Sequence, residues 1–257
     1  MAGKIEKVFM TFKTIKNIPF FLLDFFGFIE KNKEIIYEIR NGLKFIARSR
    51  TTDVGEIIVV NSDYEYPKRF FPKNKNPVIL DIGSNIGSFS LYIYNELREM
   101  KPKIYSIEAS KDNFSYLIKN VKLNGFYSIK CFNLAISNKG GVGYINTLGD
   151  PDAFKLSKLN NKNYEKVKLK TLESFCKNNN ISKIDLMKMD IEGSEHEVFD
   201  KSLNFIKEKI KAFFIEVHIL KSENDLDDFK KFLIKNNFSI ENDLDKNKLF
   251  VKNKNLK

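Results

Sequence analysis

The chain has 257 residues, of which 42% are hydrophobic and 30% charged, so it can build a sizeable core and is neither globally disordered nor a large multidomain machine. Its 44 Lys and Arg residues exceed its 33 Asp and Glu residues by 11, which favours nucleic acid, anionic glycans or membrane surfaces as partners. Only five of the cations are Arg, and Lys, Asn, Ile and Phe abound, a composition also typical of an AT-rich coding sequence. The charge therefore carries little weight by itself.

The cysteines and the N-terminal region indicate the compartment. Cys131 and Cys176 are too few for a disulfide framework or a Cys-rich zinc site, and the first residues lack the apolar run of a signal peptide, so we expect a cytoplasmic protein. The most apolar stretch, Ile18–Ile29, is interrupted by Asp24 and is far shorter than the roughly 20 residues that span a bilayer. We expect a helix packed on the main domain, with an interfacial membrane helix as the alternative.

The predicted elements divide the chain at residue 73. Residues 1–72 are predicted to form an N-terminal cap, with helix-like apolar spacing over 1–50 and a strand over Glu56–Asn61. In residues 73–257, short apolar runs alternate with helical patterns, which indicates a doubly wound, mostly parallel α/β sheet. The predicted strands are Val78–Ile82, Ile104–Glu108, Ile129–Leu134, Ile184–Met189 and Phe213–Val217, followed by a closing hairpin of Phe238–Asp243 and Lys248–Lys252. The predicted helices between them are Ser88–Met100, Asp112–Asn124, Leu172–Asn178, His196–Lys209 and Asn224–Asn236.

A glycine-containing turn follows the first of these strands. The strand ends in Asp81, and the turn with Gly83 and Gly87 leads into a helix, an arrangement that holds nucleotide-like ligands at the carboxyl ends of parallel strands. Glu108 ends the next strand, where a carboxylate can accept hydrogen bonds from both hydroxyls of a ribose. Capping of the following helices is the alternative role of the two acids.

The turn also indicates which nucleotide is bound. Asn85 stands where the dinucleotide fingerprint G-x-G-x-x-G requires its second glycine, and the chain has no phosphate loop. An acid directly before the turn suits a ligand with a cationic end. S-adenosylmethionine, which carries an ammonium and a sulfonium group, is therefore favoured over NAD.

A series of segments over most of residues 77–220 matches one protein family in order and spacing. They are DIGSNIGSFS (81–90), IEAS with Asn113 (107–113), Asn120–Gly125, NLAIS (133–137), TLESF (171–175), IDLMKMDIEGSEHEVF (184–199) and FIEVH (214–218). In these segments the chain resembles the FkbM family of class I S-adenosylmethionine-dependent methyltransferases. The resemblance implies a Rossmann-like, seven-stranded sheet with an antiparallel last strand. It also implies S-adenosylmethionine as cofactor and O-methylation of a sugar, glycan or small metabolite.

The resemblance assigns cofactor contacts as well. It implies that the glycine turn surrounds the methionine part of the cofactor, that Glu108 holds the ribose and that residues 133–135 lie near the adenine. Ser84 stands where the family often has alanine, a change between small residues. The implied cofactor-binding residues are Asp81, Gly83, Ser84, Asn85, Gly87, Glu108, Ala109, Ser110, Asn133, Ala135 and Asp190.

The catalytic candidates follow the fourth and fifth strands. Methyl transfer to a hydroxyl needs in-line alignment and gains from a base that takes the proton. The candidates are Asp190, Glu192 and His218, and we expect His218 or Asp190 to be the base. A structural role for His218 stays open, as does a divalent ion held by Asp190, Glu192 and Glu195, although no metal is predicted. Lys188, inside a buried strand, needs a carboxylate partner.

An RNA methyltransferase is the main rival function. The net charge and the basic, aromatic segment Tyr64–Lys73 favour it. The fourth strand, however, lacks the Asn/Asp-Pro-Pro-Tyr/Phe motif of base amino-group methylation and the Pro-Cys nucleophile of cytosine-C5 methylation. We therefore expect a small-molecule or glycan acceptor, which the basic surface would help to attract if it is anionic. DNA is not an expected partner, and RNA and peripheral membrane contact are disfavoured.

Overall fold

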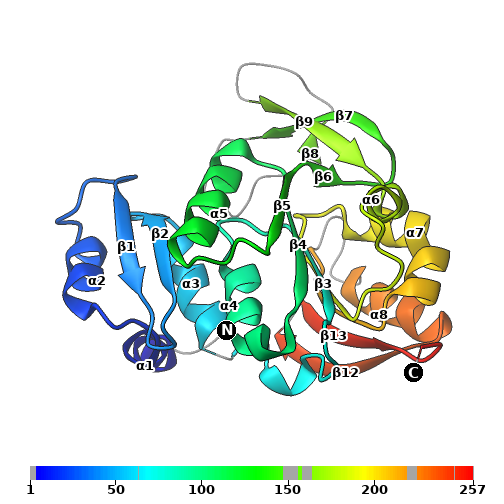
Figure 1. The fold of residues 1–257 in the computed structure, drawn as a ribbon, viewed down its shortest axis with the longest axis horizontal. Helices are drawn as coiled ribbons and strands as arrows, with labels where there is room; N and C mark the ends of the chain where they lie inside the picture. The colour runs from blue at the N-terminus through cyan, green and yellow to red at the C-terminus, as the bar shows by residue number, and fades with distance from the viewer. Residues whose placement is uncertain are drawn as a thin grey trace.

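A computed structural model describes residues 4–62, 64–146, 156–157, 164–218, 225–245 and 247–256. At its centre lies a seven-stranded sheet, seen in Figure 1. The strands are β3 (Val78–Ile82), β4 (Lys103–Glu108), β5 (Lys130–Asn133), β10 (Leu186–Met189), β11 (Ala212–Glu216), β12 (Phe238–Asp245) and β13 (Lys248–Asn253).

The order of these strands confirms the predicted sheet. It is β12-β13-β11-β10-β3-β4-β5. From β5 to β11 neighbouring strands pair in parallel, whereas β13 runs antiparallel to both β11 and β12. The sheet is therefore doubly wound and mostly parallel, with an antiparallel last strand contributed by the predicted C-terminal hairpin.

Helices cover both faces of the sheet, and each face has its own hydrophobic core. Side chains alternate along a strand, so Ile79 of β3 packs into one core and its neighbour Leu80 into the other. In Figure 1, α4 (Ser88–Leu97) and α5 (Lys111–Leu123) lie on one side of the sheet. The other side is covered by α6 (Leu172–Asn178), α7 (Glu195–Lys209) and α8 (Asp225–Lys235). These are the predicted helices, except that the first of them ends in a separate 3-10 turn, η2 (Arg98–Met100).

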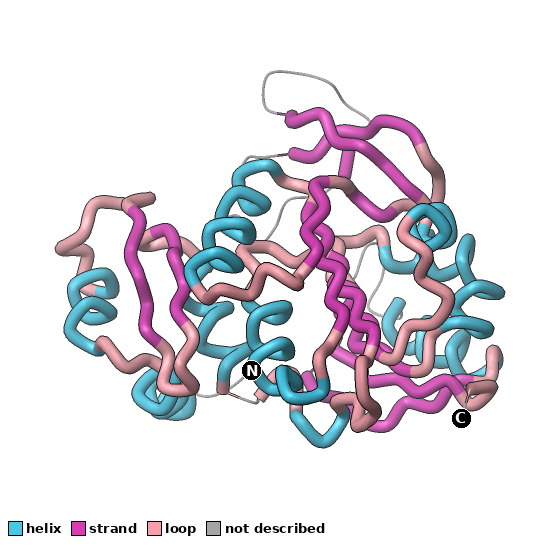
Figure 2. Tube along the Cα trace, viewed as in Figure 1, coloured by secondary structure: helices cyan, strands magenta, loops and turns pink. Residues whose placement is uncertain are grey.

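The N-terminal residues lie beside α4 and α5, at the left of Figures 1 and 2. Their buried side chains belong to the same hydrophobic core as one face of the large sheet. No helix among the described residues is long and apolar enough to cross a membrane. The elements of this region are α1 (Lys4–Thr14), α2 (Ile18–Phe25), β1 (Glu34–Glu38), β2 (Lys44–Arg48) and α3 (Asp53–Asn61).

Two predictions for this region are wrong. The predicted strand Glu56–Asn61 lies in the helix α3: β-branched residues favour a strand, but Ile57 is completely buried and the helix packs on α4. Tertiary packing here overrides local propensity. Helix-like spacing over 1–50 holds for α1 and α2 only, because residues 34–48 form an antiparallel hairpin in which buried and exposed side chains alternate along β1.

Two asparagines, one in α5 and one directly after it, cover the free edge of this hairpin. The carboxamide of Asn120 accepts a hydrogen bond from the Ile46 N–H (2.6 Å) and donates one to the Ile46 carbonyl (3.1 Å). One turn later, Asn124 makes the same pair of bonds with Lys44 (2.9 and 2.7 Å). Each carboxamide thus substitutes for a residue of a neighbouring strand, so an edge that would attract other chains is satisfied within the molecule.

A second, smaller sheet was missed by the sequence analysis. It has the order β6-β9-β7-β8 and lies above the large sheet in Figure 1. Its strands are short or rich in Lys and Gly, so no apolar run marks them. They are β6 (Ala135–Ile136), β7 (Gly141–Asn146), β8 (Leu156–Ser157) and β9 (Tyr164–Lys170).

A buried ion pair joins the N-terminal region to the rest of the fold. Arg48, at the end of β2, makes two side-chain hydrogen bonds of 2.8 Å with the carboxylate of Asp53 in α3. Its guanidinium also bonds Asp112 (2.6 Å) and Asn113 (2.9 Å) of α5. The side chain of Asp53 is completely buried, so its charge depends on this partner.

We predict that Arg48→Ala lowers the free energy of unfolding by about 3–5 kcal/mol, because it leaves the Asp53 carboxylate buried without a cation. Urea unfolding followed by circular dichroism measures the change. Arg98→Ala is the matched control, since Arg98 pairs with Glu99 at the surface, with 65% of its side chain exposed, and should cost less than about 1 kcal/mol. Equal losses in the two variants would contradict the structural role of Arg48.

Candidate functional site

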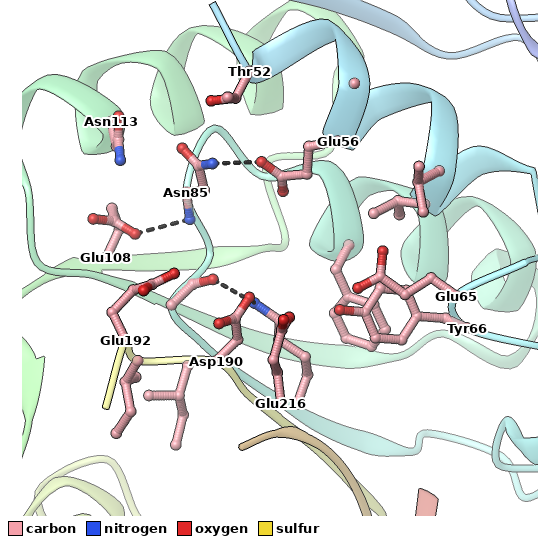
Figure 3. A pocket seen from close by; sticks show the side chains of 18 of the residues that line it. Thr52, Glu56, Glu65, Tyr66, Asn85, Glu108, Asn113, Asp190, Glu192 and Glu216 are labelled. Carbon is pink, nitrogen blue, oxygen red and sulfur yellow. Dashed lines mark hydrogen bonds and ion pairs between the residues drawn. The ribbon is translucent and has the colours of Figure 1, made fainter. Parts of the chain in front are cut away.

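A cavity of about 670 Å³ opens at the carboxyl ends of the parallel strands, a usual volume for a ligand pocket. Figure 3 shows that several of its side chains converge around Asn85, in the turn after β3. Acids outnumber bases in the described wall, which favours a ligand that carries positive charge. The acids are Glu56, Glu65, Glu108, Asp190, Glu192 and Glu216, and the bases are Lys188 and Lys248.

The glycine turn packs against the end of β10. Gly83 has a φ of +79°, and a Cβ atom there would lie 1.8 Å from the backbone oxygen of Asp190. Only glycine therefore lets β3 and β10 bring their ends together at this point. Asn85 also has a positive φ, 47°, which asparagine tolerates better than most residues.

Lys188 has the carboxylate partner that the sequence analysis required. Its side chain is 7% exposed, and its Nζ lies 3.3 Å from Asp190 and 4.0 Å from Asp81. The ammonium also donates a 2.6 Å hydrogen bond to the carbonyl of Gly83. Burial alone would lower the pKa of Lys188, but the charges of Asp190 and Asp81 outweigh it and raise that pKa, so the ammonium stays protonated.

Glu108 closes the other side of the turn. One of its carboxylate oxygens accepts a hydrogen bond from the Asn85 N–H and the other from the Ser110 N–H, both of 2.8 Å. Burial raises the pKa of Glu108 to about 7 despite these bonds. The cap of α5 is instead Ser110, whose hydroxyl accepts from the Asn113 N–H at 3.3 Å. Glu108 therefore lines the cavity rather than capping the helix.

Six of the predicted cofactor-binding residues line the cavity, and they come from four strand ends. The turn after β3 supplies two, the end of β4 and the residue after it supply two, and the segments after β5 and β10 supply one each. They are Gly83, Asn85, Glu108, Ala109, Ala135 and Asp190.

The other predicted cofactor residues lie behind the described wall and support it. Asp81 is completely buried and accepts a 2.5 Å hydrogen bond from Ser90 of α4. The hydroxyl of Ser84 accepts from the Ile107 N–H at 3.0 Å and so ties the turn to β4. Asn133 donates to the carbonyls of Glu108 and Ala109, both at 3.0 Å. Gly87 begins α4 in a left-handed conformation and Ser110 begins α5.

His218 also lies behind the wall, although Asp190 and Glu192 are part of it. Its Nδ1 is 2.9 Å from the buried carboxylate of Glu195, and its Nε2 is 3.4 Å from Glu192 and 3.9 Å from Asp190. Burial lowers the pKa of His218, but hydrogen bonds to Glu192 and Glu195 outweigh it and raise the pKa to about 10. The imidazole is therefore protonated at neutral pH.

Glu195 organises this corner of the site. Besides His218, its carboxylate accepts hydrogen bonds from the backbone N–H of Ile191 (3.1 Å) and of Gly193 (3.0 Å). These bonds fix the loop that carries Asp190 and Glu192. The sequence analysis considered Glu195 only as a metal ligand and missed this role.

Asp190, Glu192 and His218 also have the spacing of a cation site, with one ligand atom of each within 4.8 Å of the others. Positive charge is already present there, however, because Lys188 lies 3.3 Å from Asp190 and His218 is protonated. A divalent ion would have to compete with both groups. We therefore assign no metal to this cluster.

Several polar wall residues were not predicted as cofactor-binding or catalytic residues, among them Glu56, Glu65, Tyr66 and Lys248. Glu56 accepts a hydrogen bond from the Asn85 carboxamide, and burial raises the pKa of Glu56 well above its usual value. Glu65 and Tyr66 follow α3, and Lys248 of β13 bonds the carboxylate of Glu65 and lies 3.1 Å from Glu216. None belongs to a strand end that a motif marks, so no local signal could have identified them.

Comparison with known proteins identifies the family. A model of the methyltransferase FkbM domain matches residues 81–240. The chain belongs to the FkbM methyltransferase family. The methyl donor of this family is S-adenosylmethionine. A comparison with curated proteins found no match.

A solved methyltransferase FkbM structure has the same fold, and two further solved structures are similar at lower TM-scores. Methyltransferase FkbM from Methylobacillus flagellatus KT is 13% identical, with a TM-score of 0.51 over 76% of this chain and 52% of that one. This chain thus spans about half the length of that protein. M. jannaschii TYW2 in complex with AdoMet is 20% identical, with a TM-score of 0.43 over 87% and 85% of the two chains. M. capricolum TrmK in complex with S-adenosylhomocysteine is 16% identical, with a TM-score of 0.39 over 70% and 62%.

The residues of the cavity fit this methyl donor. The carboxamide oxygen of Asn85 is buried and has no hydrogen-bond partner among the described residues, so an acceptor is free for an ammonium group. Both oxygens of Glu108 keep a lone pair for ribose hydroxyls. Gly83 lines the cavity, and the surplus of wall acids suits two cationic groups.

We predict that the affinity for S-adenosylmethionine falls as the pH drops below about 7, because protonation of Glu108 removes an acceptor for the ribose hydroxyls. The dissociation constant should rise at most tenfold per pH unit. Calorimetric titrations between pH 5.5 and 8.5 measure it. In Glu108→Gln, affinity should be weaker at pH 8 and this dependence should vanish. An unchanged pH profile in that variant would place the ribose elsewhere.

Proposed function

We propose that this protein is an S-adenosylmethionine-dependent O-methyltransferase that acts on a neutral hydroxyl of a sugar, glycan or small metabolite. The observation that carries the proposal is the position of Asp190. Its carboxylate lines the cavity at the end of β10, directly beside the glycine turn and across from Glu108 (Figure 3). A hydroxyl that approaches the methyl group from this side meets a proton acceptor.

The charge of the wall supports a neutral acceptor. The described wall holds six acids and two lysines, and although burial raises the pKa of Glu56 and of Glu108, the remaining acids disfavour a phosphorylated or acidic substrate. Both lysines are already paired with acids, Lys188 with Asp190 and Lys248 with Glu65 and Glu216. The basic excess of the chain lies outside this cavity, so an anionic acceptor has no support from the wall.

The proposed mechanism assigns separate tasks to the wall residues. S-adenosylmethionine supplies a methyl group on a positively charged sulfur. Glu108 would hold the ribose of this donor and Asn85 its ammonium group. The acceptor hydroxyl donates a hydrogen bond to Asp190 and transfers its proton to that carboxylate as the new O–CH₃ bond forms. Burial raises the pKa of Asp190, but Lys188 and His218 outweigh it and lower that pKa, so the carboxylate is ionised when the acceptor binds.

In this mechanism His218 is a positioning residue. Its Nε2 faces the carboxylates of Asp190 and Glu192, and its Nδ1 faces Glu195. Protonated at neutral pH, it has no lone pair for a hydroxyl proton. It instead keeps two wall carboxylates in place and helps to keep Asp190 ionised.

An RNA acceptor finds little support in the segment that suggested it. Tyr66 packs against Phe89 with a ring distance of 4.7 Å, and Phe70, in the 3-10 turn η1 (Lys68–Phe70), stacks on Phe250 at 4.0 Å. Tyr66 and Phe71 are each 6% exposed. Of the four rings in this segment only that of Tyr64 is exposed, at 38%, so the segment offers few of the stacking contacts that aromatic side chains usually make with RNA.

Substitutions of Asp190 and His218 distinguish the proposed base from the residue that positions it. We predict that Asp190→Asn lowers kcat by about 10²–10⁴-fold, the usual contribution of general base catalysis, whereas His218→Gln lowers kcat by less than about tenfold. Steady-state methylation measures both, with calorimetry to show that donor binding persists. Glu99→Gln, at an exposed position, is the control. If His218→Gln lost as much activity as Asp190→Asn, the proton acceptor would be His218.

The acceptor class can be tested directly. The purified protein is incubated with methyl-labelled S-adenosylmethionine and, separately, with neutral sugars, nucleotide sugars, polysaccharide and total RNA. We expect label in an ether linkage that survives mild base, on a hydroxyl-bearing carbohydrate or metabolite. Label in RNA alone would overturn the proposed acceptor, and Asp190→Asn serves as the negative control in each reaction.

A further inference from the structure

The helix α2 and the turn that follows it expose apolar side chains to solvent. Phe25 is 71% exposed and Phe28 77% exposed, values typical of charged surface residues rather than of phenylalanine. We call this set the α2 surface. It comprises Phe20, Leu22, Leu23, Phe25, Phe26 and Phe28.

The polarity of α2 is the reverse of that of an ordinary surface helix, which buries its apolar side and exposes its polar side. Asp24, the one charged residue of the helix, is only 3% exposed. Its carboxylate accepts hydrogen bonds from the hydroxyl of Tyr37 and from the N–H of Arg50 (3.0 Å). The only charge of α2 is thus satisfied inside the protein, and the outward side is left without one.

Basic residues flank the α2 surface in the chain. Lys16 precedes the helix, and Lys31 and Lys33 follow the turn, all at exposed positions. Between residues 16 and 33, the one exposed acid is Glu30, which lies 3.3 Å from Lys33. On α1, the ammonium of Lys13 lies 4.2 Å from the ring centre of the exposed Phe9. Apolar side chains bordered by lysines are complementary to a bilayer with anionic headgroups.

The composition distinguishes this surface from a protein interface. The residues that contribute most of the binding energy at protein interfaces are mostly Tyr, Trp and Arg, whose polar groups form hydrogen bonds across the contact, whereas Leu is under-represented. The α2 surface consists only of Phe and Leu, and such side chains need no polar partner in a bilayer. At the length of α2, eight residues, the helix can lie in the interface but cannot span it.

We propose that the α2 surface docks the protein on anionic membranes, with its Phe and Leu side chains inserted below the headgroups. The helix is then an interfacial one, the alternative that the sequence left open. The same helices reach the cavity, since Met10 of α1 and Phe21 of α2 line its wall. Docking therefore brings the cavity near the bilayer surface. The proposal does not depend on the identity of the methyl acceptor.

Flotation of the full chain with lipid vesicles tests this. We expect it to float with vesicles of phosphatidylcholine and 30% phosphatidylglycerol, and much less with phosphatidylcholine alone. Phe25→Ser with Phe28→Ser should weaken binding at least about tenfold, as loss of two inserted rings requires. Lys13→Gln and Lys31→Gln should each weaken it about fivefold on the anionic vesicles and leave neutral vesicles unaffected.

A matched control replaces exposed apolar residues elsewhere, Tyr127→Ser with Ile234→Ser, which are 75% and 62% exposed; this variant should bind as the unmodified chain does. Thermal melts of all variants verify folding. Absence of flotation with anionic vesicles at low salt would overturn the proposal. Concentration-dependent self-association in analytical ultracentrifugation, abolished by Phe25→Ser with Phe28→Ser, would overturn it too, because a second copy would then be the occupant.

Discussion

Lys188 places a positive charge in the middle of a buried strand, and the acids around it keep it there. Its ammonium lies within 4.0 Å of Asp81 and Asp190 and bonds the carbonyl of Gly83 at 2.6 Å. An unpaired ammonium at this depth would be very costly, so the strand ends must converge where these groups meet. This charge joins the glycine turn to the end of β10 and, together with His218, keeps Asp190 ionised.

The protein is basic as a whole, but its cavity wall is rich in acids. A net charge of +11 concerns the surface, whereas ligand recognition depends on the few groups that converge in the cavity. In the cavity, the acids lie mostly at strand ends, and only two lysines pair with them. This arrangement suits a cationic methyl donor. Protonation of His218 belongs to this balance, because four neighbouring carboxylates surround its ring. A histidine in such a cluster acts by its charge more readily than as a base.

The N-terminal region contributes both to the cavity wall and to the exposed apolar surface. The Arg48 to Asp53 pair fixes α3 against the core, and α3 in turn brings Glu56 to Asn85. On its outer side the region leaves α2 with exposed rings. The outer side of α2 carries no charge because Asp24, the one acid of this helix, is held inward by Tyr37 and Arg50.

The sequence by itself determined the large sheet, its helices, the glycine turn and the acids at the strand ends, because each depends on local periodicity or on a turn that needs glycine. Tertiary structure decided the rest. Glu56 and Lys248 join the wall only through packing of α3 and β13, and the β-branched run of α3 becomes a helix because it packs on α4. His218 follows a strand end as predicted, but Glu195 holds its ring behind the wall. Such contacts join residues far apart in the chain, and no local pattern records them.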